Sequence, residues 1–412
     1  MNADYREPAG GTPTGRVLVY REEFLQPSET FIRDHLLEMP RYAVAGLANE
    51  RLEPGLQMPG LPVHLTRARG VVGRGVQFLG YRARVPRARM IGLAGAATLR
   101  RLRPDLVHAH FGPDAALIAA AAARTGTPLV ATFHGYDLTK DPTALRGARL
   151  SYDLYLDQGP RLLDQLVGII TVSGFLRSIL VDRGVDPARI DVIPCGVDTD
   201  SIEATPPVRG GPVVFVGRLT GKKGVEDLIR ATASMTDPPD LVVIGDGPLR
   251  AELTRLAENL RVAVDFRGAR SSAEVAAAIR GSSMVVMPSR RAPTGDSEGL
   301  GVVALEAAAA GRPVVGYAHG GLPDAVLDGV TGRLVPEGDV PALSRAMASV
   351  RADHALAERL GRAGRGHVEN HFQRRDLLNR VADVYDRVLA TARADGPQRR
   401  PGGPVPGRPR SQ

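Results

Sequence analysis

The sequence predicts an α/β protein built from two Rossmann-like, doubly wound domains that face each other across a cleft. The chain has 412 residues, which is enough for two domains. Short β-branched segments alternate with helical patterns along most of it, which is typical of parallel sheets covered by helices on both faces. A polar stretch rich in Pro and Gly, residues 198–211, interrupts this alternation, and an apolar segment follows at once.

Five strand candidates precede the interruption and five follow it, with helical patterns between most of them. The first five begin at Arg16 (RVLVY), Leu106 (LVHAH), Pro128 (PLVATF), Gly168 (GIITV) and Ile190 (IDVIP). The others begin at Pro212 (PVVFVG), Leu241 (LVVIG), Val264 (VDFRG), Ser283 (SMVVMPS) and Arg312 (RPVVGY). Such sheets bind ligands beyond the carboxyl ends of their strands, so we expect the functional residues in the loops there.

These segments define the expected domain boundaries. The ends of the chain are rich in Pro and Gly and cannot pack a core, so we expect disorder there. The last helical pattern either lies on the second domain or crosses back to the first. The six parts are a disordered N-terminus (1–15), an N-terminal domain (16–200), a linker (201–211), a C-terminal domain (212–373), a C-terminal helix (374–394) and a disordered tail (395–412).

The composition excludes several classes of protein. The single cysteine, Cys195, rules out an intramolecular disulfide framework and fits a reducing compartment. The sequence shows no signal peptide and no apolar run long enough to span a bilayer, so we expect a cytoplasmic protein. Tryptophan is absent and aromatic residues make up 4% of the chain. Since no nucleic-acid reader motif accompanies the net charge of +8, nucleic acid is not an expected partner.

The positive charge is concentrated in one region. Residues 67–103 contain ten arginines and no acidic residue, and apolar residues lie between them. This pattern predicts either contact with an anionic membrane surface or recognition of a phosphate-bearing acceptor, with a solvated helical face as the simpler alternative. A peripheral position on the inner face of the membrane is therefore a second possible location.

The stretch SEGLGVVALEAAAAG places two glutamates around Gly-Leu-Gly. A helix is expected after Gly301, so that Glu298 precedes its N-terminus and Glu306 lies near its second turn. Free backbone N–H groups at such a helix start, around Gly299 and Leu300, suit a phosphate, and the carboxylates can accept hydrogen bonds from hydroxyl groups. A nucleotide sugar has this layout, although two ordinary helical glutamates would give the same pattern.

Two further strand ends carry ligand-binding signals. In FVGRLTGKKG, Gly217 ends a strand, and Arg218 and Lys223 follow in the loop. Two cations there can hold a diphosphate and stabilise it as a leaving group, although surface charges in a turn are the alternative. VIGDGPLR has Gly245 but lacks the third glycine of a dinucleotide fingerprint, so it indicates only a close backbone approach.

Histidines follow or occupy strands of the first half. His134 in ATFHGYDLTK lies past a strand end, where an imidazole can bond a sugar hydroxyl, although a structural role is commoner for a lone histidine. His108 and His110 share one face of a strand but show no third ligand, so we do not predict a metal there. The pair Asp198 and Asp200 is assigned to a turn. We therefore expect no metal and no cofactor.

The stretch QPSETFIRDH follows the first predicted strand. Ser28 is expected to cap a helix, and Glu29 provides an acid in its first turn. The helix start would face the cleft if the strand order is as predicted, and an ordinary cap is the alternative. No Ser-His-Asp grouping, HExxH or Walker A sequence is present, which disfavours hydrolases and NTPases.

Together these motifs resemble one family, the retaining nucleotide-sugar glycosyltransferases of family 4, which have the GT-B fold. The resemblance rests on GRLTGKKG, GDGPLR, VVMPS, SEGLGVVALEAAAAGRPVVG, GGLPDAV, GVTGRLV and IPCGVD, which cover most of residues 106–340 in the family's order. SETFI, HAHFG and HGYDL are similar, more narrowly, to the colanic-acid branch of exopolysaccharide biosynthesis.

The resemblance implies a role for each matching residue. Glu298 would contact hydroxyls of the donor sugar, Glu306 the ribose, and the backbone of residues 299–301 the diphosphate. Arg218 and Lys223 would bind the phosphates, His134 would lie near the donor sugar, and the backbone at Gly268 and Ala269 would meet the base. Three residues are assigned to the acceptor side of the cleft: Ser28, Glu29 and Asp137.

Two departures from the family and several alternatives stay open. The chain lacks the glycine pair that many relatives have after the first strand, and it has Gly301 where many have proline. The expected reaction is transfer of a hexosyl group to a hydroxyl of a saccharide, a lipid-linked saccharide or a natural product. A nucleotide-sugar epimerase or dehydrogenase would need a fuller glycine motif. The non-enzymatic alternative is an inactive GT-B scaffold that binds membranes.

Overall fold

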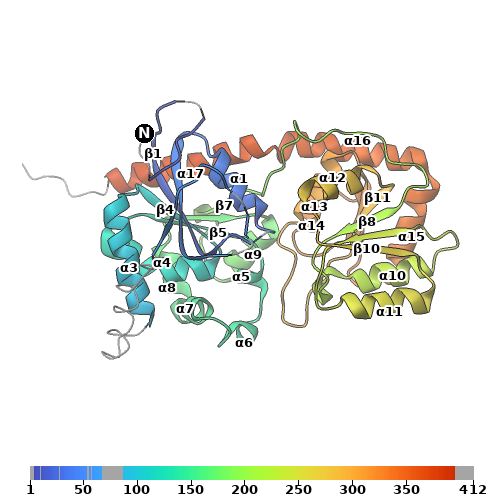
Figure 1. Cartoon of the computed structure of the whole chain (residues 1–412), viewed down its shortest axis with the longest axis horizontal. Helices are drawn as coiled ribbons and strands as arrows, with labels where there is room; N and C mark the ends of the chain where they lie inside the picture. The colour runs from blue at the N-terminus through green and yellow to red at the C-terminus, as the bar shows by residue number, and fades with distance from the viewer. Residues whose placement is uncertain are drawn as a thin grey trace, which may run out of the picture.

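The computed structural model describes residues 4–9, 11–26, 28–52, 55–56, 58–66 and 87–394, and it describes side chains in the last range from residue 92. Most of the Arg-rich segment, residues 67–86, and the tail 395–412 lie outside the described residues. The molecule consists of two parallel sheets with helices on their faces, arranged side by side (Figure 1). No helix in the described part of the chain combines the length and apolar character needed to cross a bilayer.

The N-terminal sheet has seven parallel strands in the order β3-β2-β1-β4-β5-β6-β7. The strands are β1 (Gly15–Phe24), β2 (Tyr42–Arg51), β3 (Val63–Leu65), β4 (Leu106–His110), β5 (Leu129–Phe133), β6 (Gly168–Thr171) and β7 (Ile190–Val192). The helices are α1 (Thr30–Glu38), α3 (Arg87–Leu102), α4 (Gly112–Thr125), α5 (Tyr136–Thr139), α6 (Pro142–Leu145), α7 (Leu150–Gln158), α8 (Pro160–Gln165) and α9 (Gly174–Asp182), with a 3-10 turn η1 (Pro187–Arg189).

The C-terminal sheet has six parallel strands in the order β10-β9-β8-β11-β12-β13. The strands are β8 (Val213–Val216), β9 (Leu241–Ile244), β10 (Val264–Gly268), β11 (Met284–Met287), β12 (Val314–Tyr317) and β13 (Gly332–Val335). The 3-10 turn η2 (Gly221–Lys223) precedes α10 (Val225–Ala233), α11 (Arg250–Leu260), α12 (Ser272–Arg280), α13 (Val302–Ala309), α14 (Leu322–Ala325), α15 (Val340–Ala352), α16 (His354–His371) and α17 (Arg374–Ala394).

Both sheets have the doubly wound order, which confirms the predicted fold class. In each, the strand order reverses beside the first strand, between β1 and β4 and between β8 and β11. A crevice forms outside the carboxyl ends of the strands at such a switch point. The loops after β1, β4, β8 and β11 are therefore the places where each domain can bind a ligand.

The sequence prediction missed three of the described strands and wrongly assigned residues 4–9 as disordered, while residues 1–3 and 10 lie outside the described residues. β2 reads YAVAGLANER, whose Ala and Gly content hides a buried parallel strand; β3 and β13 are short. Within residues 4–9, Tyr5 is buried and its hydroxyl donates to the Leu102 carbonyl at 3.2 Å. Arg6 exchanges backbone hydrogen bonds with Val44, so this segment is held against the sheet.

The chain crosses between the domains twice, at neighbouring points. Val197 and Gln373 form a parallel bridge, the Val197 N–H donates to the Phe372 carbonyl, and the Arg374 N–H donates to the Val197 carbonyl. The predicted linker is anchored to the second domain by Arg312, a buried guanidinium that donates to the Thr205 carbonyl at 2.6 Å. Movement between the domains would therefore concentrate at these two crossings.

The last helix returns to the first domain. α17 lies along the N-terminal domain, whereas α16 lies on the C-terminal one (Figure 1). Leu377, Val381 and Tyr385 of α17 are buried in a cluster with residues of the first sheet. Arg374 pairs with Asp34 of α1 at 3.0 Å. α17 therefore fastens the two domains together.

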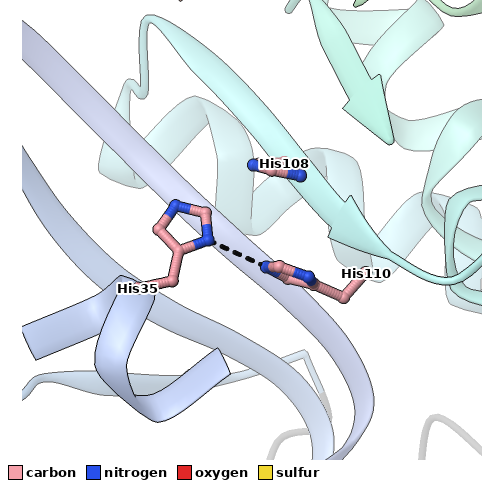
Figure 2. A group of neighbouring side chains, drawn as sticks. All are labelled: His35, His108 and His110. Carbon is pink, nitrogen blue, oxygen red and sulfur yellow. Dashed lines mark hydrogen bonds between the residues drawn. The ribbon is translucent and has the colours of Figure 1, made fainter. Parts of the chain in front are cut away.

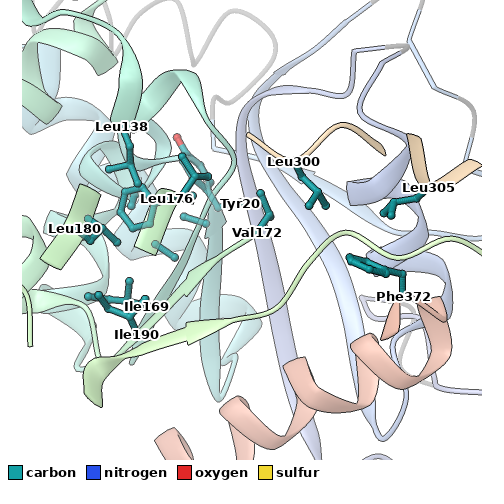
Figure 3. Close-up of a cluster of buried hydrophobic side chains, with 14 of the residues drawn as sticks. Tyr20, Leu138, Ile169, Val172, Leu176, Leu180, Ile190, Leu300, Leu305 and Phe372 are labelled. Carbon is teal, nitrogen blue, oxygen red and sulfur yellow. The ribbon is translucent and has the colours of Figure 1, made fainter. Parts of the chain in front are cut away.

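One hydrophobic cluster contains residues of both domains. Leu300 and Leu305 of the second domain and Phe372 before α17 belong to the same cluster as Val172 and Leu176 of the first (Figure 3). Burial of such surface stabilises an interface by about 25 cal/mol per Å². Apolar packing in this cluster therefore joins the two domains.

Candidate active site

The Gly-Leu-Gly stretch forms the expected helix start. Gly301 is the N-cap of α13 and has φ +90° and ψ 60°, a left-handed conformation that favours glycine. The backbone N–H groups of Gly299, Leu300 and Gly301 donate to no group within the described residues. They lie at the positive end of the helix dipole. The arrangement is suited to binding an anionic group such as a phosphate.

Glu298 is held by cations and a hydroxyl just before this helix. Lys223 donates to its Oε2 at 2.5 Å, and the Ser289 hydroxyl, just past β11, donates to the same oxygen at 3.1 Å. Burial raises the pKa of the Glu298 carboxyl, but the charges of Lys223 and Lys222 and these hydrogen bonds outweigh it and lower the pKa to about 2. Glu298 is therefore a carboxylate at neutral pH.

Glu306, one and a half turns into α13, is in the opposite situation. Its carboxylate makes no hydrogen bond or ion pair to any described residue. Burial, and to a lesser degree the charge of Asp34, raises its pKa to about 7. A carboxylate without partners at the edge of a helix start can accept hydrogen bonds from ligand hydroxyls. The two glutamates therefore differ: Glu298 is held in place, and Glu306 is available to a ligand.

The loop after β8 supplies cations to the cleft. Arg218 is exposed and its side chain pairs with no described residue, whereas Lys223 is engaged by Glu298. Lys222, which the sequence argument did not single out, donates to Asp296 at 2.9 Å and to the Ser297 carbonyl at 3.4 Å. Both Arg218 and Lys222 line the interdomain cavity described below. The doubled lysine in GKKG was the signal for Lys222.

Three strand-end glycines form one backbone surface. The Gly217 N–H donates to the Ile244 carbonyl, and Gly245, at φ +129°, donates to the Gly268 carbonyl at 2.8 Å. A Cβ on Gly245 would collide with the carbonyl of Gly217. Ala269 follows and is exposed. The structure thus brings together the donor-side backbone positions that the sequence placed on three separate loops.

The first domain meets the donor loop through the segment after β5. His134 and Gly135 pack against Gly299 so closely that a Cβ on Gly299 would overlap the His134 carbonyl oxygen. The Asp141 N–H donates to the Thr294 carbonyl at 2.8 Å. His134 is half-buried at this junction. The predicted sugar-side histidine therefore lies beside the predicted diphosphate loop.

A polar cavity of about 330 Å³ lies between the domains. Arg21, near the end of β1, lines this cavity. It donates to Glu29 at 2.5 Å and forms an ion pair with Asp114. The cavity is lined from the first domain by Arg21, Glu22, Glu23, Gln26, Ser28, Glu29, Phe31, Phe111, Asp114, Tyr136, Arg149 and Tyr152, and from the second by Arg218 and Lys222. Ser28 and Glu29, two of the residues predicted for the acceptor side, line this cavity.

The predicted helix cap and one acceptor-side assignment need correction. Glu29, not Ser28, is the N-cap of α1, and its side chain makes no capping bond because it pairs with Arg21. Ser28 is exposed at the rim of the cavity. The buried Asp137 carboxylate instead accepts backbone N–H groups of Gly112 at 3.1 Å and Gly135 at 2.8 Å. Asp137 therefore shapes the loop after β5 and is not offered to an acceptor.

His35 of α1 supplies the third imidazole that the sequence argument did not find beside His108 and His110. The three side chains lie together, with His35 hydrogen-bonded to His110 (Figure 2). They offer nitrogens within 4.8 Å of one another. The reason for not predicting a metal there, that no third ligand exists, was wrong. His35 lies in SETFIRDH, 73 residues before His108, so only the strand order could have revealed it.

Comparison with known families divides the chain at the same linker. The model "Glycosyltransferase Family 4" matches residues 43–201, and "Glycosyl transferases group 1" matches residues 203–367. The chain is 33% identical over 317 residues to GDP-mannose-dependent alpha-(1-6)-phosphatidylinositol monomannoside mannosyltransferase of Mycolicibacterium smegmatis, which covers 70% of this chain and 79% of that protein. It is 34% identical over 298 residues to glycogen synthase of Mycobacterium tuberculosis, covering 70% of each.

A solved structure shows the same two-domain architecture. Anabaena Alr3699/HepE, crystallised in complex with UDP and glucose, superposes with a TM-score of 0.73 at 18% identity. The match covers 90% of this chain and 100% of that chain. At this identity the likeness concerns the fold alone.

Proposed function

Because the chain belongs to the family 4 glycosyltransferases and has their GT-B fold, we propose that it transfers a hexosyl group from a nucleoside diphosphate sugar to an acceptor hydroxyl, with retention of anomeric configuration. The observation that carries this proposal is the start of α13. Its free N–H groups, at residues 299–301, lie between a fixed carboxylate, Glu298, and an available one, Glu306. A sugar, a diphosphate and a ribose match these three features in that order.

The proposed step is a same-face displacement. The bond between the sugar C1 and the β-phosphate oxygen breaks, and a bond forms from C1 to the acceptor oxygen on the same face. The acceptor proton passes to the departing phosphate oxygen. Arg218 and Lys223 stabilise the negative charge that develops on the diphosphate. Glu298 is a weak nucleophile, because Lys223 and Ser289 bond its carboxylate and help to lower its pKa to about 2.

The polar cavity supports a hydroxyl-rich acceptor. Several charged side chains that line the cavity form ion pairs with one another. Arg21 pairs with Glu29, and Arg149 pairs with Glu23 at 2.8 Å. Tyr152 adds an aromatic side chain to this lining. Paired charges and aromatic surfaces favour binding of neutral sugar rings through hydrogen bonds and stacking. We infer a saccharide or lipid-linked saccharide acceptor.

A membrane-associated acceptor agrees with the Arg-rich region. At the end of α3, Arg100, Arg101 and Arg103 are exposed, and Leu93 is 45% exposed. Exposed basic residues and an exposed apolar side chain on one helix favour an anionic membrane surface. The mannosyltransferase relative acts, by its name, on a phosphatidylinositol mannoside. We therefore infer a cytoplasmic enzyme that binds the inner membrane surface peripherally.

The assignment to exopolysaccharide biosynthesis is also part of the proposal. It rests on the motifs SETFI, HAHFG and HGYDL, which lie far apart in the sequence. In the structure the residues of these motifs meet: Phe31 packs on His134 with ring centroids 4.6 Å apart, and His110 contacts His134 at 2.9 Å. One cluster of contacts therefore links the three motifs.

The experiment is a transfer assay with a panel of nucleoside diphosphate sugars. Release of the nucleoside diphosphate is measured with and without mono- and disaccharide acceptors, and the anomer of the product is read by NMR. We expect one donor to be used, with the donor's anomeric configuration kept in the product. A product of inverted configuration would refute the same-face mechanism. Absence of release from every donor, by protein that binds none of the nucleotides, would refute the proposed function.

A further inference from the structure

Three buried histidines, the half-buried His134 and Tyr385 form one continuous series of hydrogen bonds that ends at His134. His108 Nε2 contacts the Thr132 hydroxyl at 2.7 Å, and its Nδ1 contacts the Tyr385 hydroxyl at 2.5 Å. That hydroxyl also contacts His35 Nε2 at 2.9 Å. The remaining steps are His35 Nδ1 to His110 Nε2 at 3.0 Å, then His110 Nδ1 to His134 Nε2 at 2.9 Å.

The number of protons available to these side chains allows only two arrangements of the imidazole tautomers. A neutral imidazole has one N–H donor and one acceptor nitrogen, and a phenol donates one hydrogen bond. Burial lowers the pKa of all four imidazoles, that of His35 to about 4, so they are neutral at pH 7. Each ring nitrogen in this series of hydrogen bonds has one partner. All four rings must therefore donate in the same direction along the series. Either all four rings carry the proton on Nδ1, or all four carry it on Nε2.

The Thr132 end of this series of hydrogen bonds favours the Nδ1 arrangement. The Thr132 hydroxyl has no second partner among the described residues, so it is satisfied when it donates to His108 Nε2. In the opposite arrangement His108 donates to Thr132, and the threonine proton is left buried without an acceptor. A buried donor without a partner costs about 1–3 kcal/mol. The direction of the whole chain is thus set at Thr132.

We propose that this histidine relay fixes His134 as an Nδ1–H donor directed at the donor sugar, with Tyr385 and Thr132 as positioning residues. His134 Nδ1 faces the Cys195 sulfur at 3.9 Å, a weak acceptor that a sugar hydroxyl can replace. The backbone carbonyl of His134 abuts Gly299 of the donor loop, which places the residue beside the proposed diphosphate site. The sugar contact rests on the proposed function, but the proton arrangement does not.

A metal ion at the three-histidine cluster is the competing interpretation. A divalent ion would need an unprotonated nitrogen from each of His35, His108 and His110. In the relay the acceptor nitrogen of each ring is already occupied by a donor from its neighbour. The two interpretations therefore predict different protonation of the same nitrogens, and one spectrum separates them.

The experiment is NMR of the full-length protein labelled with 15N-histidine. Long-range proton–nitrogen correlations distinguish a protonated ring nitrogen from an unprotonated one. The relay predicts four rings with a single tautomer, protonated on Nδ1, in the protein as purified and after chelator treatment. Mixed tautomers at these rings, four Nε2 tautomers, or one tightly bound zinc per chain by elemental analysis would overturn the proposal. This result does not depend on finding a substrate.

Two tyrosine variants test the link to His134. Tyr385→Phe removes the hydroxyl that joins His108 to His35 and leaves the ring packing. We expect mixed tautomers at His134 and a fall in kcat of about fivefold to tenfold, the size of one hydrogen bond, with nucleoside diphosphate affinity within about twofold. Tyr42→Phe is the matched control, since Tyr42 packs on Tyr385 but donates to Asp386 outside the relay.

The outcomes of the two variants are separable. An unchanged His134 spectrum in Tyr385→Phe would overturn the coupling, as would equal effects of the two variants on kcat. If no donor is turned over by the unmodified protein, the tautomer shift in Tyr385→Phe still tests the relay. Thr132→Val gives a second test: it removes the group that sets the direction, so His108 and His134 should both lose their single tautomer.

Discussion

Replacing Glu298 by glutamine should destabilise the C-terminal domain at neutral pH. The pKa of this carboxyl falls from 4.5 to about 2 on folding. At about 1.4 kcal/mol per pKa unit, the ionised form therefore stabilises the fold by about 3 kcal/mol. The side chains of Glu298 and Lys223 are 13% and 20% exposed, so solvent screens this pair only in part. Glu298→Gln also leaves the Lys223 ammonium without its partner.

The pH dependence gives the sign of the effect. A carboxyl whose pKa is lowered on folding contributes its full stabilisation above its unfolded pKa, here 4.5, and loses it as pH falls toward 2. The free energy of unfolding, measured by urea titration with circular dichroism, should be about 3 kcal/mol lower in Glu298→Gln at pH 7. The difference from the unmodified protein should shrink as pH falls below 4.5.

A neighbouring pair provides the control for this measurement. Asp296 accepts from Lys222 at 2.9 Å with similar exposure, 20% and 21%. The Ser289 hydroxyl also bonds Glu298, whereas the Asp296 carboxylate has no second donor among the described residues, and an ion pair without such support contributes about 0–1 kcal/mol. Asp296→Asn should therefore cost much less than Glu298→Gln. Equal costs for the two variants, or a Glu298→Gln cost that does not depend on pH, would refute the electrostatic argument.

Three further predictions concern the proposed reaction. Arg218→Ala should lower kcat about 100-fold, close to 3 kcal/mol, because it removes a cation that stabilises the departing diphosphate; near-normal steady-state turnover would contradict this. Nucleotide affinity should rise between pH 6 and 8, because the Glu306 carboxyl, with a pKa of about 7, must ionise to accept ribose hydroxyls, and calorimetry of Glu306→Gln should show no such rise. The protein should sediment with anionic vesicles at low salt and not with neutral ones; equal sedimentation with both would argue against the membrane surface.

The sequence predicted those strands that are rich in β-branched residues and bounded by polar turns. The central strand beginning at Val213, which reads VVFV, has this form. The sequence pattern did not predict β2, because Gly46 in this strand lies against the Phe24 ring. No local pattern shows such a contact. The order of the N-terminal segment was not predicted for the same reason. Tyr5 is buried by residues of α3 and β1 and not by its neighbours in the sequence.

The donor side of the site was predictable because its residues lie in short stretches of sequence. Glu298, Glu306 and the glycines between them lie within nine residues, so helix geometry alone placed them. The first-domain side was harder. Asp137 proved structural because backbone N–H groups converge on it, and the side chains hydrogen-bonded in series to His134 come from β4, α1 and α17. Contacts of this range depend on the strand order and on α17 crossing back.

The central claim, that the start of α13 is a nucleotide-sugar site, is tested most directly by calorimetry with UDP, GDP, ADP and dTDP. The unmodified protein is compared with Glu306→Gln and with Glu258→Gln, an exposed glutamate on α11. We expect one nucleotide to bind tightly, with affinity lowered about tenfold to 100-fold in Glu306→Gln, as for a lost hydrogen bond to a charged group, and unchanged in the control. Equal affinity in all three proteins, or binding of none of the four nucleotides, would contradict the account.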